Sequence, residues 1–181
     1  MAKTWVYADP HFSHANILNF KRHDGSPLRE FKSIEEMDAF MIHWYNELVS
    51  PEDRVYILGD VAMNRKGLDR AVPSLNGRKV LVKGNHDMDK LAYYSQYFDD
   101  VRAYVPKKGF ILSHIPIHPG SLGRWNVNIH GHLHYNRVGQ DYYDDPNNVG
   151  KPDERYECVS VEHTNYRPVL LDDILKRKGL K

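Results

Sequence analysis

Seven short runs of apolar, β-branched and aromatic residues recur along this 181-residue chain, and they constrain its fold more than any other feature. Each run is four or five residues long and is bounded by glycine, proline, aspartate or asparagine, a pattern typical of buried strands. The runs span residues 4–8, 54–58, 79–83, 109–113, 127–130, 157–161 and 168–171. We therefore expect a core that contains several short strands.

Segments with helical spacing separate several of these runs. In the clearest, residues 34–49, Ser33 and Glu36 form a capping box, apolar side chains recur on one face, and Pro51 follows the end. Weaker helices are expected over residues 67–75, 89–97 (with Asp89 as N-cap) and 172–178. Because strands alternate with helices in the first half and follow one another in the second, the order predicts an α/β sandwich with mixed sheets.

Length and composition are those of one globular domain. A chain of 181 residues with 41% hydrophobic content can bury a sizeable core, and no repeat, low-complexity tract or linker divides it. We expect a single domain over residues 1–181, with an exposed polar loop over residues 140–155.

Charge and cysteine content exclude several classes of protein. Lys and Arg number 25 against 24 Asp and Glu, so bulk electrostatic attraction to nucleic acid is not expected. The single cysteine, Cys158, excludes an internal disulfide, and the N-terminus lacks the apolar core of a signal peptide. No apolar run approaches the ~20 residues that cross a bilayer. We expect a cytoplasmic protein with no membrane partner, and the sequence leaves its oligomeric state open.

Five small polar clusters each come directly after a predicted strand. They are Asp9-Pro10-His11, Gly59-Asp60, Gly84-Asn85-His86-Asp87, Ser113-His114 and Gly131-His132-Leu133-His134. The carboxyl ends of strands in α/β folds meet at a common edge, so these clusters are expected to converge. Carboxylate, imidazole and amide groups are ligands for divalent metals. Thiolates are absent from the clusters, which excludes a structural zinc site of the cysteine type.

The number of candidate ligands indicates two metal ions rather than one. A mononuclear catalytic site uses three protein ligands, but this chain offers seven: Asp9, His11, Asp60, Asn85, His114, His132 and His134. Two ions that share a bridging carboxylate fit that number and can clamp a phosphate. Taken singly, most clusters have a plainer explanation, such as a turn at Gly59-Asp60 or a core histidine at His114. Those explanations do not account for all seven residues falling at strand ends.

The ordered set D-x-H, G-D, G-N-H-D, S-H and G-H-x-H resembles the calcineurin-like metallophosphoesterases, and the resemblance spans residues 9–134. It implies a four-layer α/β/β/α sandwich of two mixed sheets that carries two divalent metal ions. By the same resemblance Asp60 bridges the ions. The resemblance assigns the first ion to Asp9, His11 and His134, and the second to Asn85, His114 and His132.

Two further residues of the third motif take roles from this resemblance. His86 is similar to the family's non-ligand histidine, which contacts the phosphate and can protonate the leaving oxygen. Asp87 would then hold the His86 imidazole in its working tautomer.

One motif departs from the family's common pattern, G-D-x-x-D-R. The chain reads GDVAMN over residues 59–64, so the second carboxylate and the arginine are missing. This departure puts in doubt a substrate contact that the arginine would make, for which Asn64 or Arg65 is a candidate substitute. His14 and His118 lie near the motifs and are further candidates for contact with the substrate. Residues 11–17 and 159–169 are similar to a compact bacterial and phage-encoded branch of the family.

The resemblance implies hydrolysis of a phosphate ester, with manganese, iron, zinc or nickel as candidate ions and manganese favoured. The near-neutral charge argues against a processive nuclease, and we expect a phosphodiesterase acting on nucleotide-like or small substrates. One alternative is a phosphomonoesterase acting on a phosphoprotein or a metabolite. Another is a scaffold that kept the fold and lost catalysis, but such a protein is expected to lack a ligand or the non-ligand histidine, and none is missing here.

Overall fold

The computed structural model describes residues 2–139 and 151–180, in which nine strands form two mixed sheets and four α-helices accompany them. Most of the polar stretch predicted as a loop, residues 140–150, lies outside the described residues. None of the helices in the described ranges has the length and apolarity that a membrane span requires.

The first sheet has five strands in the order β4-β3-β2-β1-β9. Its strands β1 to β4 run parallel to their neighbours, and β9 pairs antiparallel with β1 at the edge. Their bounds are β1 Thr4–Tyr7, β2 Arg54–Ile57, β3 Arg78–Val82, β4 Asp100–Arg102 and β9 Val169–Leu170. The parallel arrangement brings the carboxyl ends of β1, β2 and β3 to the same edge.

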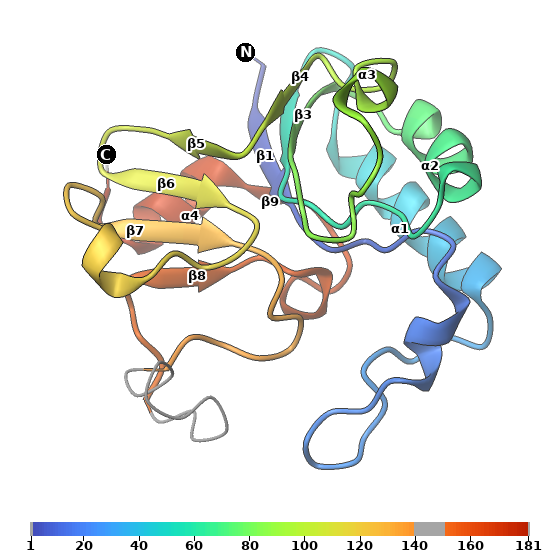
Figure 1. Ribbon diagram of the computed structural model, residues 1–181, viewed down its shortest axis with the longest axis horizontal. Helices are drawn as coiled ribbons and strands as arrows, with labels where there is room; N and C mark the ends of the chain where they lie inside the picture. The colour runs from blue at the N-terminus through green and yellow to red at the C-terminus, as the bar shows by residue number, and fades with distance from the viewer. Residues whose placement is uncertain (1, 140–150, 181) are drawn as a thin grey trace.

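The second sheet has four strands in the order β5-β6-β7-β8 and lies beside the first (Figure 1). Strands β6, β7 and β8 are parallel, and β5 pairs antiparallel with β6. The bounds are β5 Tyr104–Pro106, β6 Phe110–Ser113, β7 Val127–His130 and β8 Tyr156–Cys158.

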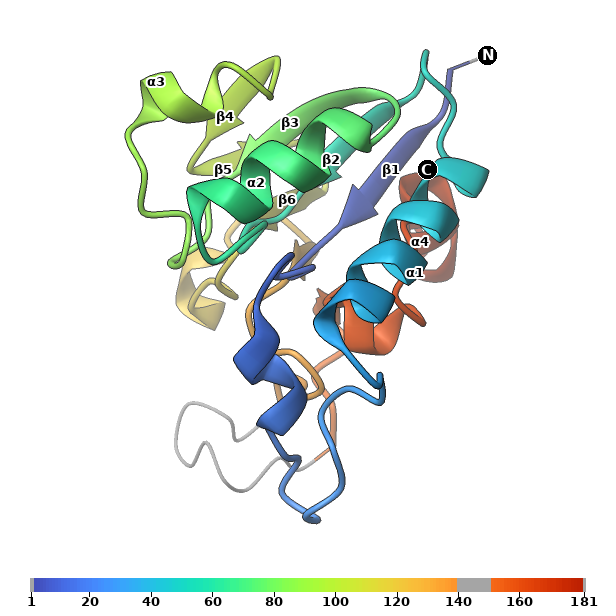
Figure 2. The ribbon, with the colours of Figure 1, turned by 90° about the vertical axis from the view of Figure 1, so that its right-hand side faces the viewer.

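The four helices differ in length and in the face they cover. They are α1 Ile34–Leu48, α2 Arg65–Ala71, α3 Leu91–Tyr94 and α4 Leu171–Arg177. Figure 2 shows α1 and α2 on one face of the first sheet. At the start of α1, Ser33 accepts a hydrogen bond from the Glu36 amide, but the Glu36 carboxylate accepts from Lys32 rather than completing a capping box with Ser33.

Two large cores follow from the alternation of side chains along the strands. Trp5 and Tyr7 of β1 pack with Met37, Met41 and Tyr45 of α1 on the outer face of the first sheet. The other face contributes Val6 and Tyr56 to the inner core, with Leu112 and Ile129 of the second sheet and Ile174 of α4. A small third cluster contains Leu122, Val138 and Tyr156.

The predicted α/β sandwich with two mixed sheets is confirmed, with local differences. The third cluster contains Tyr156 of β8. None of its residues belongs to an α-helix, so among the described residues loops, rather than a helix, cover this part of the second sheet. Strands β4 and β5 were not predicted, because Asp100–Arg102 and Tyr104–Pro106 lack an apolar run. The third helix is shorter than predicted: Lys90 is its N-cap, because the Asp89 carboxylate pairs with Arg65 instead.

Candidate metal centre

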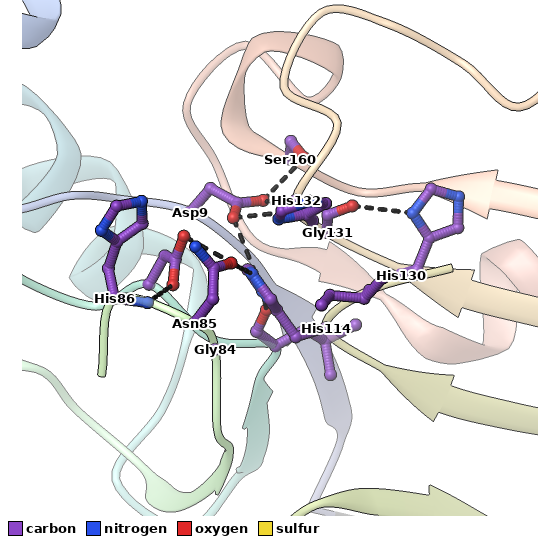
Figure 3. A network of polar contacts seen from close by, with 12 residues as sticks. Asp9, Gly84, Asn85, His86, His114, His130, Gly131, His132 and Ser160 are labelled. Carbon is purple, nitrogen blue, oxygen red and sulfur yellow. Dashed lines mark hydrogen bonds and ion pairs between the residues drawn. The ribbon is translucent and has the colours of Figure 1, made fainter. Parts of the chain in front are cut away.

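The ends of five strands meet at one place, where the two sheets adjoin. Asp9 and His11 follow β1, Asp60 follows β2, and Asn85 follows β3. His114 follows β6, and the segment with His132 and His134 follows β7. Figure 3 shows Asp9, Asn85, His114 and His132 turned toward a common centre. The predicted convergence of these clusters is therefore present in the structure.

Asp60 occupies the middle of this arrangement. In two groups of three residues, all ligand atoms lie within 4.8 Å of one another: Asp60 with His114 and His132, and Asp60 with Asp9 and His11. Asp60 is the one residue common to both groups, and only 2% of its surface is exposed. The buried Asp and His side chains can thus hold metal ions on either side of one shared carboxylate.

The protonation of His114 indicates a cation beside it. Its Nδ1 lies 2.8 Å from the backbone carbonyl of Leu58, which can only accept, so Nδ1 carries the hydrogen in the neutral ring. The other nitrogen, Nε2, then presents a lone pair to the Asn85 Oδ1 at 2.8 Å and to the Asp60 Oδ2 at 3.5 Å. These three atoms form a donor set that a cation between them would satisfy.

His11 gives the same indication from the other side of Asp60. The residue is 2% exposed, and neither ring nitrogen has a hydrogen-bond partner among the described residues. Burial holds the pKa of His11 well below its ordinary value, so the ring is neutral and can donate an electron pair. Buried polar atoms are normally paired, and a metal ion would supply the missing partner.

Asp9 is fixed by groups from the second half of the chain. Its carboxylate accepts from the backbone amide of His132 at 2.9 Å and from the Ser160 hydroxyl at 2.6 Å (Figure 3). The side chain is fully buried, and this burial raises the pKa of Asp9 to about 6, partly offset by His114 and His134. A bound cation favours the ionised carboxylate and would lower that pKa.

The backbone is strained at several of the candidate ligands. Five of the seven predicted ligands have positive φ, a conformation that costs a non-glycine residue roughly 1–3 kcal/mol. They are Asp9 (56°), His11 (51°), Asp60 (52°), His132 (70°) and His134 (51°). Such strain persists where the surroundings over-determine it, and it gathers at functional sites.

Three glycines allow the ligand-bearing segments to approach closely. A Cβ on Gly59 would lie 2.5 Å from the His114 Nδ1, and one on Gly131 would lie 2.6 Å from the Asp9 Oδ2. A Cβ on Gly84 would collide with the Asp60 carboxylate. Only glycine fits at these positions without displacing a ligand.

Beside His134 lies a buried ion pair that the sequence did not indicate. The Glu162 Oε1 lies 3.0 Å from the His134 Nδ1 and accepts from the Arg29 Nε at 2.8 Å. Arg29 also donates to the backbone carbonyls of Asp9 and Pro10 at 2.7 and 2.8 Å. The side chains of Arg29 and Glu162 are both 0% exposed.

Glu162 controls the charge and orientation of His134. Burial alone would raise the pKa of Glu162, but Arg29 and His134 outweigh it and hold that pKa at about 2. Burial opposes the charged form of His134 as well, yet Glu162 outweighs this effect and raises the pKa of His134. With Nδ1 directed at Glu162, Nε2 is the atom left to bind a cation. In the sequence, the one feature near this pair was the similarity of residues 159–162 to a compact branch of the family.

The structure places His86 at the candidate metal centre but does not pair its ring with Asp87. The exposed His86 ring lies with its centroid 5.6 Å from that of His11, at the open side of the centre, while its amide donates to Asp60 at 2.8 Å. The buried Asp87 carboxylate accepts from the backbone amides of Asp60, Val61 and Gly84 at 2.9, 3.1 and 2.8 Å. The assignment of Asp87 as the partner of the His86 imidazole is corrected: it ties two motif loops together, because three amides use its oxygens.

The predicted substrate residues are placed unequally around the centre. His14 lies beside it, with its ring centroid 5.5 Å from that of His11. Asn64 lines a small cavity with His86, but its side chain caps α2 by accepting from Gly67. His118 caps a 3₁₀ turn by accepting from Gly120. Arg65 is paired with Asp89, so it does not replace the missing arginine of the second motif.

The chain has relatives in an archaeon and in phages. It is 34% identical over 179 residues to the uncharacterized protein MJ1445 of Methanocaldococcus jannaschii, covering 97% of this chain and 91% of that protein. The gene 66 protein of Mycobacterium phage L5 is 28% identical over 169 residues, covering 74% of this chain and 78% of the phage protein. No family model matches the chain.

The fold also occurs in a solved structure. The crystal structure of AQ665 from Aquifex aeolicus, a protein described as of unknown function, matches with a TM-score of 0.71 and 28% sequence identity. The match covers 98% of this chain and 100% of that one. The whole described architecture, including both sheets that meet at the candidate metal centre, thus has a solved counterpart.

Proposed function

The chain belongs to one family with the Methanocaldococcus jannaschii protein MJ1445, and from its candidate metal centre we propose that it is a calcineurin-like metallophosphoesterase. Its reaction is the hydrolysis of phosphate esters, with phosphodiesters of nucleotide-like or small molecules as the preferred class. The proposal includes the four-layer α/β/β/α form of the sandwich and two divalent ions at the centre, with manganese favoured.

The observation that carries the proposal is that Asp60 belongs to two groups of ligand residues. One set contains His114 and His132, the other Asp9 and His11, and each set meets Asp60 within 4.8 Å. Asn85 stands beside His114, and His134 stacks on His11 with ring centroids 5.1 Å apart. Oxygen and imidazole donors without thiolate suit manganese, iron, zinc and nickel.

When bound, two such ions supply Lewis-acid charge for the phosphoryl oxygens and acidify water. The protein's own residues divide the remaining work. Four ligands, Asp9, His11, Asp60 and His114, are buried, whereas Asn85 and His86 are exposed, so the phosphate approaches from the His86 side. There the His86 imidazole can donate a proton to the leaving oxygen, a role worth about 10²–10⁴-fold in rate.

A substrate comparison tests the reaction class. With added Mn²⁺, the purified protein is expected to release p-nitrophenolate from bis-p-nitrophenyl phosphate faster than from p-nitrophenyl phosphate. Cleavage of the monoester alone would make the protein a phosphomonoesterase. Absence of cleavage with every candidate metal would support a catalytically silent scaffold.

A His86→Ala variant tests the proposed acid. We expect kcat to fall by about 10²–10⁴-fold while the bound manganese, measured by mass spectrometry, stays at the wild-type level. For an ester with a better leaving group, the fall in kcat should be smaller, because the leaving oxygen needs protonation less. Wild-type kcat in this variant would show that His86 is not the acid.

A further inference from the structure

A cleft of about 590 Å³ lies on the His132 and His134 side of the candidate metal centre. Its other lining residues include Phe20, Arg22, Tyr135 and Asn136. The volume is within the range of small-molecule sites. Because two candidate metal ligands form part of its wall, a group attached to a phosphate at the centre can extend into this cleft.

The outer wall of the cleft is a hairpin-like excursion held by its own hydrogen bonds. The Leu28 amide donates to the Phe20 carbonyl at 2.8 Å, and the Arg22 amide donates to the Ser26 carbonyl at 2.8 Å. Lys21 and Pro27 form an antiparallel bridge between these two contacts. In Figure 1 this excursion projects from the body of the molecule, in the blue part of the chain. Backbone contacts within residues 20–28 therefore hold this wall of the cleft in place.

Side chains in the cleft suit a flat ring that carries negative charge. Phe20 is 42% exposed, unusual for a large apolar side chain, and its ring meets the edge of His14 at a centroid distance of 5.7 Å. The Arg22 guanidinium lies 5.0 Å from the centroid of the Tyr135 ring. Its Nε is buried and without a partner, and no described carboxylate lies within ion-pair distance of it. A planar cation on an aromatic ring offers stacking and charge together.

His86 faces a different cavity. A smaller space of about 200 Å³ is lined by His86, Met63, Met88 and Tyr94, among others, whereas His86 does not line the larger cleft. The group that His86 protonates is the leaving group. The larger cleft therefore adjoins the substituent that stays on the phosphorus.

We propose that the cleft between residues 19–23 and 132–136 binds a flat aromatic substituent that remains on the phosphate, so that the substrate is a phosphodiester bearing an aromatic ring such as a nucleobase. This inference rests on the proposed phosphoesterase function and names its substrate class. Phe20 and Tyr135 provide the stacking surface, and Arg22 provides the charge.

A pair of diesters with one leaving group tests the proposal. Bis-p-nitrophenyl phosphate and ethyl p-nitrophenyl phosphate both release p-nitrophenolate, but only the first retains an aromatic ring. We expect the wild-type KM to be about tenfold lower for the first, the fold-change of one aromatic stacking contact. Phe20→Ala and Arg22→Ala should reduce this ratio to about twofold, with Arg22→Lys intermediate because it keeps charge without a plane.

Arg124→Ala is the matched control. Its guanidinium lies 5.5 Å from the Trp125 ring centroid, in a cavity with Gly109 at the opposite end of β6 from His114. This variant should keep the wild-type KM ratio. A wild-type KM ratio near one, or an equal fall of this ratio in Arg124→Ala and in Phe20→Ala, would overturn the proposal.

Calorimetric titration separates failure of the cleft from failure of the proposed function. Phenylphosphonate and methylphosphonate are not hydrolysed, and both can be titrated into the manganese-loaded and the metal-free protein. We expect phenylphosphonate to bind about tenfold more tightly, with the preference lost in Phe20→Ala. If wild type cleaves neither diester but keeps this preference, the proposed function fails and the cleft assignment stands. If it cleaves both and shows no preference, the cleft assignment fails alone.

Discussion

At the scale of single residues, the arginine buried behind the candidate metal centre determines how the first motif is held. Arg29 donates to the carbonyls of Asp9 and Pro10 and forms a buried pair with Glu162. Asp9 and His11 both have positive φ in the same turn, so the backbone there needs an external restraint. Arg29 supplies it, and through Glu162 it also orients His134.

Replacement of Arg29 by methionine keeps most of the side-chain volume and removes the charge. We expect Arg29→Met to lower the free energy of unfolding by about 3–5 kcal/mol, because the buried Glu162 carboxylate loses its guanidinium partner and keeps only His134. Manganese affinity should fall by about 10–100-fold, since the ligands lose their orientation. Urea denaturation and metal titration measure the two effects.

The control for that variant is Arg65→Met. Arg65 pairs with Asp89, but its side chain is 60% exposed, so its loss should cost far less stability than the loss of Arg29. Equal destabilisation by both substitutions would mean that the buried pair has no special role.

At the scale of elements, the turn after β7 requires glycine for reasons of space. Gly131 has no unusual φ, but an added Cβ would lie 2.6 Å from the Asp9 Oδ2, 2.9 Å from the Ala8 Cβ and 3.0 Å from the Leu58 carbonyl. We expect Gly131→Ala to displace Asp9 and to weaken manganese binding by at least about tenfold. In Gly120→Ala the nearest atom is a His118 ring nitrogen at 3.2 Å, at the end of a side chain, so that variant should bind manganese normally.

The start of β2 is joined to β1 by one carboxylate, which makes this junction sensitive to acid. Asp53 is buried and accepts from the Lys3 amide at 2.7 Å, the Trp5 indole at 2.8 Å and the Ser50 amide at 3.1 Å. These hydrogen bonds, with that from the Lys3 amide the strongest influence, lower the pKa of Asp53. A lowered pKa means that the stabilisation is present above the unfolded value of about 3.9 and is lost as the pH falls through the folded pKa.

Asp53→Asn should therefore destabilise the protein at pH 7 and have progressively less effect below about pH 4. Urea midpoints of both proteins over this range measure the difference. Asp173→Asn, at an exposed position of α4, is the control and should lose less stability than Asp53→Asn at pH 7. If the difference in urea midpoint between Asp53→Asn and wild type stays constant with pH, the ionised form of Asp53 is not what stabilises the junction.

The elements also show what could be predicted from the sequence. The strands that carry the five clusters were predicted, because burial on both faces leaves an uninterrupted apolar run bounded by turn residues. Arg29 and Glu162 were not predicted as partners, because 133 positions separate them and neither lies in a periodic segment. Asp87 was assigned to its neighbour His86, but the fold placed three backbone amides closer to its oxygens.

At the scale of the whole molecule, the candidate metal centre joins the two sheets. Asp9, His11, Asp60 and Asn85 come from the ends of first-sheet strands, whereas His114, His132 and His134 follow strands of the second sheet. Ions held between these sets would oppose separation of the sheets, since unfolding would break every ligand contact. Binding to the folded state alone stabilises it by mass action.

Manganese at a hundred times its dissociation constant should add about 2.7 kcal/mol of stability, which raises Tm by roughly 5–10 °C in a domain of this size. A chelator should reverse the shift. Asp60→Asn should abolish it, because both ligand groups share that carboxylate, whereas Asp173→Asn should retain it. Differential scanning calorimetry measures all three proteins. If the wild-type Tm does not change with any candidate metal, the two sheets are not joined through metal ions, because an ion bound by ligands from both sheets would raise Tm.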